Sequence, residues 1–270
     1  MSIASIMVSL DLGPSAASRV RLAADLAGRF EATLTGVAAR MIPGLGPVED
    51  VKSAQAAYDK ERSKLAAEFE RIKEVFTRNV GPEVRMGWRE AEGGAEAFLI
   101  QQARGADLAI LGRSSSEEGR GAMAADPGAV LIEVGRPVLV VPPDLDHLKA
   151  ARIVIAWKDA PEARRAVTAA LPFVAHADQV YVVSAGADAP FEGAEEVSEF
   201  LARHGAHVTP HFLDVRAGKI ADEIQRFASY QDADLVVMGG YGHSRLREWL
   251  FGGVTRDILR VSPLCCLMSH

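Results

Sequence analysis

The chain has 270 residues, of which 49% are hydrophobic and 24% charged, a composition typical of proteins that bury one large core or two smaller ones. A formal net charge of -6 gives no electrostatic footprint for nucleic acid, whose binding depends largely on Lys and Arg that neutralise phosphates, so no nucleic-acid partner is expected. No apolar stretch approaches the length of a membrane span, and the first residues lack the basic segment of a signal peptide, so we expect a cytoplasmic protein without a membrane partner.

The first half of the chain predicts alternating strands and helices. An apolar strand over 6–11 precedes an alanine-rich helix over 16–27, and a long charged helix is predicted over 53–80. The later strands at 106–112 and 136–141 are apolar at successive positions, which is typical of strands covered by helices on both faces. The pattern therefore predicts a parallel α/β sheet.

The segment PPDLDHLKA, residues 142–150, follows the last of these strands. Two prolines stop a strand, and the polar residues after them suit an exposed connection. We therefore predict an N-terminal domain over residues 1–146 and a C-terminal domain over residues 147–270.

The second half repeats the first in the same order. The strand at 153–158 matches the opening strand, ADLVVMG at 233–239 matches ADLAILG at 106–112, and SPLCCLM at 262–268 matches RPVLVV. A shorter helix replaces the long charged helix of the first half. The repeat predicts two copies of one domain.

Cys265 and Cys266 are the only cysteines in the sequence. Neighbouring residues of a strand point to opposite faces, so a disulfide between them is geometrically awkward. Their apolar surroundings favour buried structural thiols over metal ligands, and no metal site is predicted.

A glycine-rich segment separates the strand at 233–239 from the last predicted helix. Gly239 and Gly242 lie at the strand end, and Gly252 and Gly253 directly precede the helix. In an open α/β sheet, ligands bind beyond the carboxyl ends of the strands, and glycine lets backbone N–H groups approach a phosphate. We therefore predict that the unpaired N–H groups of the first helical turn bind phosphate oxygens.

Side chains around these glycines extend the candidate site. A threonine hydroxyl and two loop cations are added as phosphate contacts. A lysine beyond the strand at 153–158 is also added, with a merely solvated lysine as an equal alternative. The full candidate set is Met238, Gly239, Gly242, His243, Arg245, Gly252, Gly253, Val254, Thr255 and Lys158.

The glycine spacing resembles the G-x2-G-x9-G-[S/T] nucleotide loop of the universal stress protein family. Gly239, Gly242 and Gly252 match its glycines, whereas Gly253 stands where the family has Ser or Thr. The resemblance covers nearly the whole chain as two copies. It implies two tandem Rossmann-like α/β domains, each an open five-stranded parallel sheet between helices, paired as a pseudo-dimer through their last strands.

The first half has a degenerate loop. Gly112 is retained, but Ser115 replaces the second glycine, and Asp126 and Pro127 stand at the third glycine and its neighbour. A carboxylate repels phosphate, and proline removes a backbone donor. We therefore expect nucleotide binding, where it is retained, in the second half.

The strand ends differ in the opposite sense. Asp11 in the first half matches the acidic residue that the family places beside the adenine. Lys158 stands at the equivalent position of the second half, within Trp157-Lys158-Asp159 where the family usually has Asp-Gly-Ser. The first half therefore retains part of the base side of the site, and the second half retains the loop.

The sequence contains no G-x-S-x-G, H-E-x-x-H or G-x-x-x-x-G-K-[ST] motif. The resemblance implies a stress-response or regulatory protein that binds ATP, ADP or AMP, with or without Mg²⁺, and is at most a slow ATPase. The alternative is a ligand-free scaffold that acts through protein–protein contacts, in which the glycines form only a helix cap and tight turns. A homodimer or another protein partner stays open.

Overall fold

The structure, a computed structural model of the chain, describes residues 2–44, 50–113, 123–186, 189, 193–215, 219–242 and 253–270. The first half contains the strands β1 (Ser5–Ser9), β2 (Thr33–Arg40), β3 (Met86–Glu92), β4 (Leu108–Gly112) and β5 (Val138–Val141). Its helices are α1 (Ala16–Arg29), α2 (Val51–Asn79), α3 (Ala95–Gln102) and α4 (Pro127–Glu133), with a short 3-10 helix η1 (Ala103–Gly105).

The second half has the same order of elements. Its strands are β6 (Arg152–Ala156), β7 (Gln179–Ala185), β8 (Val208–Leu213), β9 (Leu235–Gly239) and β10 (Cys265–Ser269). Its helices are α5 (Pro161–Val174), α6 (Ala194–Arg203), α7 (Ile220–Tyr230) and α9 (Val254–Val261).

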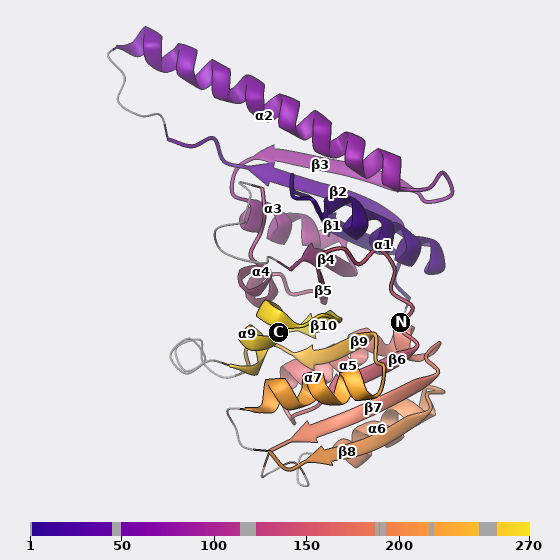
Figure 1. Ribbon diagram of the computed structural model, residues 1–270. Helices are drawn as coiled ribbons and strands as arrows, with labels where there is room; N and C mark the ends of the chain where they lie inside the picture. Colours follow the sequence, from indigo (N-terminus) through magenta and orange to yellow (C-terminus); the bar gives the residue numbers. More distant parts are fainter. Residues whose placement is uncertain are drawn as a thin grey trace.

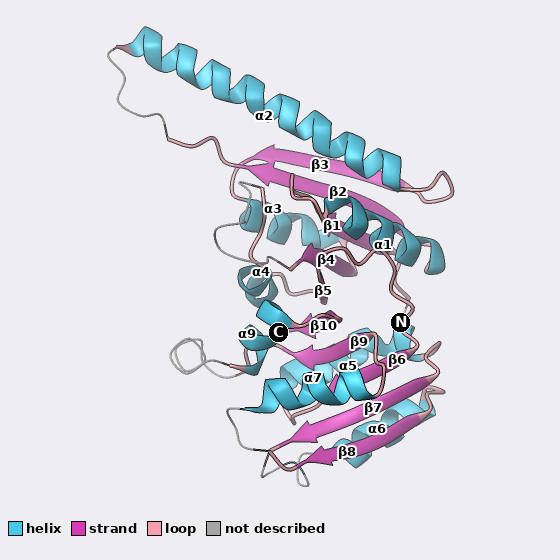
Figure 2. Cartoon of the chain, in the orientation of Figure 1, coloured by secondary structure: helices cyan, strands magenta, loops and turns pink. Residues whose placement is uncertain are grey.

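The strands form one 10-stranded sheet in the order β3-β2-β1-β4-β5-β10-β9-β6-β7-β8. Within each half all strand pairs are parallel, and helices cover both faces of the sheet (Figures 1 and 2). This arrangement confirms the predicted fold class of two tandem Rossmann-like domains. The outer strands are β3 and β8, and β8 contains Pro210, which an edge strand tolerates because one side needs no ladder hydrogen bond.

The two halves meet at the antiparallel pair of β5 and β10. Leu139 lies opposite Leu267, Val138 opposite Met268, and Val140 opposite Cys266. This register is symmetric, because each strand contributes equivalent residues around the central leucine pair, as in the self-complementary interface of a two-fold dimer. The predicted pairing of the last strands is therefore confirmed.

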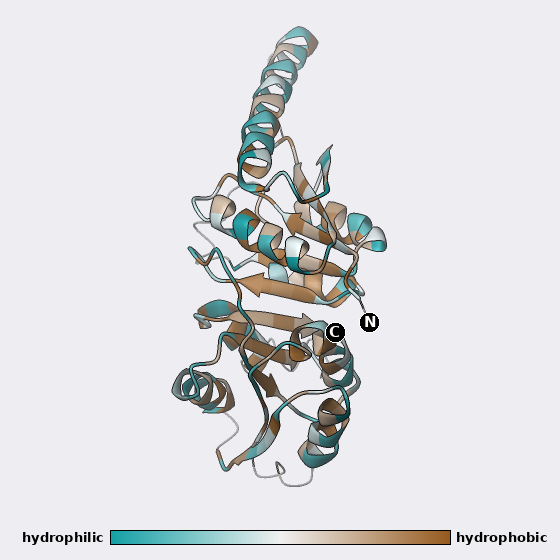
Figure 3. Cartoon of the chain, turned by 90° about the vertical axis from the view of Figure 1, so that its right-hand side faces the viewer, coloured by the Kyte–Doolittle hydropathy of each residue, from teal (hydrophilic) through white to brown (hydrophobic). Residues whose placement is uncertain are grey.

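Apolar side chains fill a layer on each face of the sheet, and both layers run through the two halves. One layer holds the buried residues of α1, α2 and α5, and the other holds those of α3, α4, α7 and α9. Figure 3 shows the strands of the junction as predominantly hydrophobic. At the end of α1, Phe30 packs edge-on against Phe173 of α5 with ring centroids 5.3 Å apart. Apolar burial of this kind drives the two halves together.

Helix α2 buries apolar side chains only along its second half. Its buried residues are Leu65, Phe69, Ile72 and Phe76, whose spacing places them on one face, while the first half projects beyond the sheet (Figure 1). The helix begins at Asp50, whose side chain accepts a hydrogen bond from the Ser53 amide at 2.7 Å.

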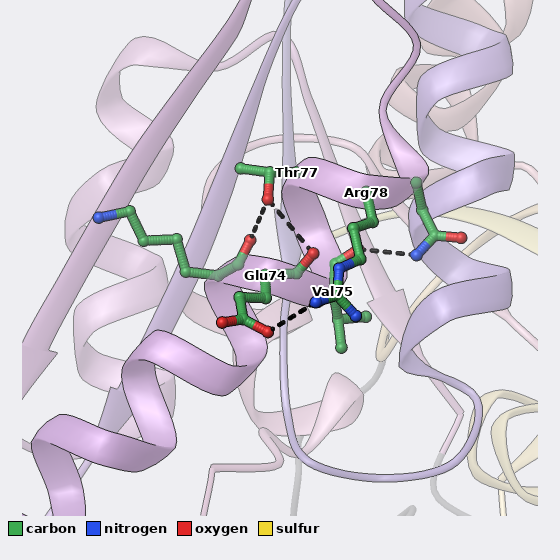
Figure 4. Close-up of polar contacts among 6 residues, drawn as sticks. Glu74, Val75, Thr77 and Arg78 are labelled. Atoms are coloured by element: carbon green, nitrogen blue, oxygen red, sulfur yellow. Dashed lines mark hydrogen bonds and ion pairs between the residues drawn. The ribbon is translucent and has the colours of Figure 1, made fainter.

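The last turns of α2 are fixed by local hydrogen bonds (Figure 4). The Thr77 hydroxyl donates to the Lys73 carbonyl at 3.0 Å, and Arg78 pairs with Glu74 at 3.1 Å. Asn79 accepts a hydrogen bond from Arg21 of α1 at 3.1 Å, which ties the helix end to its neighbour.

The segment between β5 and β6 runs along α1, and the predicted boundary between residues 146 and 147 falls within it. Arg21 pairs with Asp146 at 3.3 Å, and Arg29 donates to the Leu148 carbonyl at 2.5 Å. Leu148 and Ala150 are each 1% exposed, so the expectation of a wholly exposed connection is wrong at these two residues, whose apolar side chains join the core. Among the described residues, no helix is long and apolar enough to cross a membrane.

The leucine pair at the junction offers a test of what joins the halves. Leu267 is fully buried, and Leu267→Ala should lower the free energy of unfolding by about 2–5 kcal/mol, because it removes apolar contacts and leaves a cavity. Leu12→Ala, at a residue 39% exposed, should change it by less than about 0.5 kcal/mol. Urea denaturation measures both, and equal losses would contradict the assigned role of the junction.

Candidate functional site

The candidate site lies where the order of the sheet reverses, between β6 and β9. Ala156 pairs with Met238 near the carboxyl ends of these neighbouring strands. The helix after β6, α5, packs on one face of the sheet, and the helix after β9, α9, packs on the other. The carboxyl ends of β6 and β9 are therefore the position at which open α/β sheets bind ligands.

Two glycines of the predicted loop permit close approach of α5. A Cβ on Gly239 would lie 2.7 Å from the backbone nitrogen of Ala163 and 2.9 Å from the carbonyl carbon of Glu162. A Cβ on Gly242 would overlap the Glu162 carboxylate, which therefore lies directly against this glycine. The contact places a negative charge at the turn where phosphate is predicted to bind.

The turn between these glycines is fastened by Tyr241, which has a positive φ of 56°. Its backbone N–H donates to the Thr255 hydroxyl oxygen at 3.2 Å, and Thr255 is 3% exposed. This hydroxyl thus links the strand end to the first turn of α9. Thr255 is brought to the predicted site, where its oxygen already accepts one hydrogen bond.

The same turn contacts the first half of the chain. A Cβ on Gly128 of α4 would lie 2.5 Å from the Tyr241 hydroxyl, and a Cβ on Gly240 would lie 2.5 Å from Leu131 of the same helix. The Gly240 amide also donates to the Ser269 carbonyl at 2.9 Å. The turn after β9 therefore forms part of the interface between the halves.

The two equivalent helices α4 and α9 begin differently. Asp126 is the N-cap of α4 and accepts a hydrogen bond from the Ala129 amide at 2.9 Å. Gly253 is the N-cap of α9, and no side chain that the structure describes caps that helix. Asp126 thus corresponds to Gly253, and the predicted match of Asp126 with Gly252 is wrong by one residue, because it relied on aligning dipeptides without the helix starts.

In the first half, an arginine fills the crevice at the equivalent strand end. A Cβ on Gly112 would overlap the Arg19 guanidinium, whose Nε donates to the Ser9 carbonyl at 2.9 Å. The same guanidinium pairs with Asp11 at 2.6 Å, and the other carboxylate oxygen of Asp11 accepts from the Gly13 amide at 2.7 Å. Asp11, the expected neighbour of an adenine, is therefore engaged within the protein.

The remaining predicted residues are placed as follows. Met238 is buried at the end of β9, Val254 opens α9, and Lys158 is exposed beyond β6. His243, Arg245 and Gly252 lie outside the described residues.

Three residues important to the site had no distinctive signal in the sequence. In the sequence, Glu162 is indistinguishable from any acidic residue in a first helical turn, and Arg19 is indistinguishable from a solvent-exposed helix arginine. The role of Tyr241 follows from its position between Gly240 and Gly242, which signals only a tight turn.

The two cysteines are buried in β10, as predicted. Burial raises the pKa of Cys266 to about 11, and it raises that of Cys265 as well, so both thiols stay protonated at neutral pH. Among the described residues, no group of three or more His, Cys, Asp or Glu side chains is arranged to hold a metal ion.

Comparison with protein families finds a likeness in the second half. Residues 149–270 match the model of the Universal stress protein family. No curated protein matches the chain.

Two solved structures share the architecture of nearly the whole chain, and a third aligns with about half of it. A universal stress protein from Archaeoglobus fulgidus DSM 4304 aligns with 99% of this chain and 96% of its own, at 14% identity and a TM-score of 0.73. A functionally unknown protein from Pseudomonas aeruginosa PAO1 aligns with 98% of this chain and 92% of its own, at 18% identity and a TM-score of 0.56. A universal stress protein in complex with cAMP aligns with 52% of this chain and 98% of its own, at 20% identity and a TM-score of 0.37.

The ion pair in the first crevice can be tested by its removal. The Arg19 and Asp11 side chains are 6% and 16% exposed, so Arg19→Met should cost about 3–5 kcal/mol of unfolding free energy by leaving a carboxylate buried without its cation. The double variant Arg19→Met/Asp11→Asn should recover most of this loss in urea denaturation. Strictly additive losses would show that the two groups do not interact.

Proposed function

We propose that this chain, whose residues 149–270 match the model of the Universal stress protein family, binds an adenine nucleotide at the carboxyl ends of β6 and β9. The ligand is ATP, ADP or AMP, as the resemblance to the family implies. The protein acts in a stress response as a cytoplasmic regulator, with turnover at most that of a slow ATPase.

The start of α9 carries the proposal. Gly253 has no side chain with which to cap the first turn, so backbone N–H groups there can donate to phosphate oxygens, and the helix dipole favours an anion there. The equivalent turn of α4 is already capped by Asp126, and the crevice beside it is occupied by Arg19. The contrast supports one binding site, in the second half.

The proposed site is coupled to the interface between the halves. Tyr241 and Gly240 belong to the turn that leads into the glycine loop, and both lie against α4 of the first half. A ligand that reorders this turn would therefore alter packing between the halves. A regulatory role needs such a differential contact, because a ligand shifts an equilibrium only by binding its two states unequally.

The carboxylate of Glu162 disfavours ligands that carry many negative charges. It lies against Gly242, so it opposes each added phosphate charge at short range. A Mg²⁺ ion bound with a polyphosphate would offset this repulsion. The same contact favours the second candidate function, a scaffold of tandem domains that binds no nucleotide and acts through protein–protein contacts.

Identification of a co-purified ligand separates the two candidates. Mass spectrometry of freshly purified, denatured protein should release an adenine nucleotide, and calorimetry should detect binding of ATP with Mg²⁺ or of AMP. Absence of any released nucleotide, together with no heat of binding for either compound, would favour the scaffold.

A substitution at Gly253 tests the location of the site. Gly253→Asp gives α9 the cap that α4 has, so the fold should be retained, while the carboxylate should weaken nucleotide binding at least tenfold by repelling phosphate. Gly253→Ser, which restores the family's hydroxyl, should bind at least as tightly as the natural protein. If calorimetry gives the same nucleotide affinity for both variants, the site does not lie at the start of α9.

A substitution at Glu162 tests the charge condition. Glu162→Gln should tighten ATP binding without Mg²⁺ by about tenfold, the effect of roughly 1.4 kcal/mol of relieved repulsion, and should change AMP binding less. Glu195→Gln removes the same charge from the first turn of α6 and serves as the control. If both variants shift ATP affinity equally, only the net charge of the protein matters.

A further inference from the structure

The connecting segment between the halves occupies a groove along α1. Its Asp146 pairs with Arg21 at 3.3 Å, and its carbonyls at Leu148 and Lys149 accept hydrogen bonds from Arg29 at 2.5 and 3.2 Å. The Leu148 side chain is buried in the core. The connecting segment therefore supplies a carboxylate, backbone carbonyls and an apolar anchor to its contact with α1.

The symmetry of the sheet creates an equivalent groove along α5. The end of β10, with His270, corresponds to the end of β5, where the connecting segment starts. Ser2 and Ile3 precede β1 just as the last residues of that segment precede β6. Figures 1 and 3 place both ends of the chain beside the junction of the halves.

No described segment covers the groove along α5. Two adjoining cavities of about 420 and 450 Å³ lie there, and both are lined by Ser2, Ile3 and Pro172. Each cavity lies within the size range of ligand pockets, and together they form an elongated depression. Ile3, Leu108 and Pro172 provide apolar lining.

Basic side chains face this groove from both halves. Arg136 of the first half makes one hydrogen bond, to the Arg104 carbonyl at 3.3 Å. Arg165 of the second half makes no hydrogen bond or ion pair with any residue that the structure describes. Arg164 also lines the groove and pairs with Asp159.

Carboxylates balance only part of this positive charge. Asp107 lines the first cavity, where its Oδ2 accepts hydrogen bonds from the Ala4 and Ser5 amides at 2.9 and 3.0 Å. Glu31 lines the second cavity together with Arg29, His176 and His204. Arginines therefore outnumber carboxylates among the residues that line the groove.

We propose that the groove along α5 binds an extended acidic segment of a partner protein. Carboxylates of the segment pair with Arg136 and Arg165, and an apolar side chain packs on Ile3 and Pro172, as Leu148 packs in the equivalent groove. Because the groove spans both halves, the partner bridges them. One end of this groove adjoins the proposed nucleotide site, because a ring nitrogen of His270 lies 2.9 Å from the Gly240 carbonyl oxygen.

A designed peptide tests the proposal directly. The probe is a fluorescent peptide, PPDLDDLEA, which keeps the leucines and Asp146 of the connecting segment and replaces its His147 and Lys149 by acidic residues. Fluorescence anisotropy with nucleotide-free protein should show saturable binding. Arg165→Glu and Arg136→Glu should each weaken it at least tenfold, with folding verified by circular dichroism.

Two controls make the outcome decisive. Arg62→Glu, on the exposed face of α2, makes the same charge change away from the groove and should leave binding unchanged. A peptide with serine in place of both leucines should bind at least tenfold more weakly. The proposal fails if no saturable binding is seen up to millimolar protein, if Arg62→Glu weakens binding as much as Arg165→Glu, or if the serine peptide binds equally well.

Discussion

The antiparallel pairing of β5 with β10 is the constraint on which the rest of this molecule depends. It joins two parallel sheets into one and removes an exposed edge from each half. It also brings α4 beside α9, so the turn after β9 packs on the other half through Gly240 and Tyr241. The candidate site is consequently part of the domain interface. A conformational change in the turn after β9 would therefore alter its contacts with α4 of the first half directly.

The equivalent strand ends of the two halves are lined by different side chains. In the first half, Arg19 lies against Gly112 and neutralises Asp11, so a positive charge of the protein itself occupies the strand end. In the second half, the corresponding space between β6 and β9 is bordered by glycines and by the carboxylate of Glu162. The two halves thus share one backbone fold, but the side chain at the strand end is a cation in the first half and an anion in the second.

The sequence was sufficient for much of the architecture. Apolar runs and the internal repeat predicted the strands, the long helix and, through the family resemblance, the pairing of the last strands. The sequence repeat did not predict which residues of the last strands are equivalent. Aligning Pro137 with Pro263 matches Val138 with Leu264, whereas the strand pairing makes Val138 equivalent to Cys266, two residues later. The sequence also missed the contacts of Arg19 and Glu162, because side chains meet across elements only after packing. Leu148 was taken as exposed because its polar neighbours outweigh one leucine in a local pattern.

The outer strands show how the duplicated sheet avoids indefinite growth. The ten-stranded sheet still has two edge strands, β3 and β8. Pairing of an edge strand with that of another molecule would extend the sheet from one molecule to the next. At one border β3 carries Arg89, Glu90 and Glu92, and at the other Pro210 interrupts the row of amide donors in β8. The ten-stranded sheet therefore has two edges that are both unsuited to pairing with another molecule.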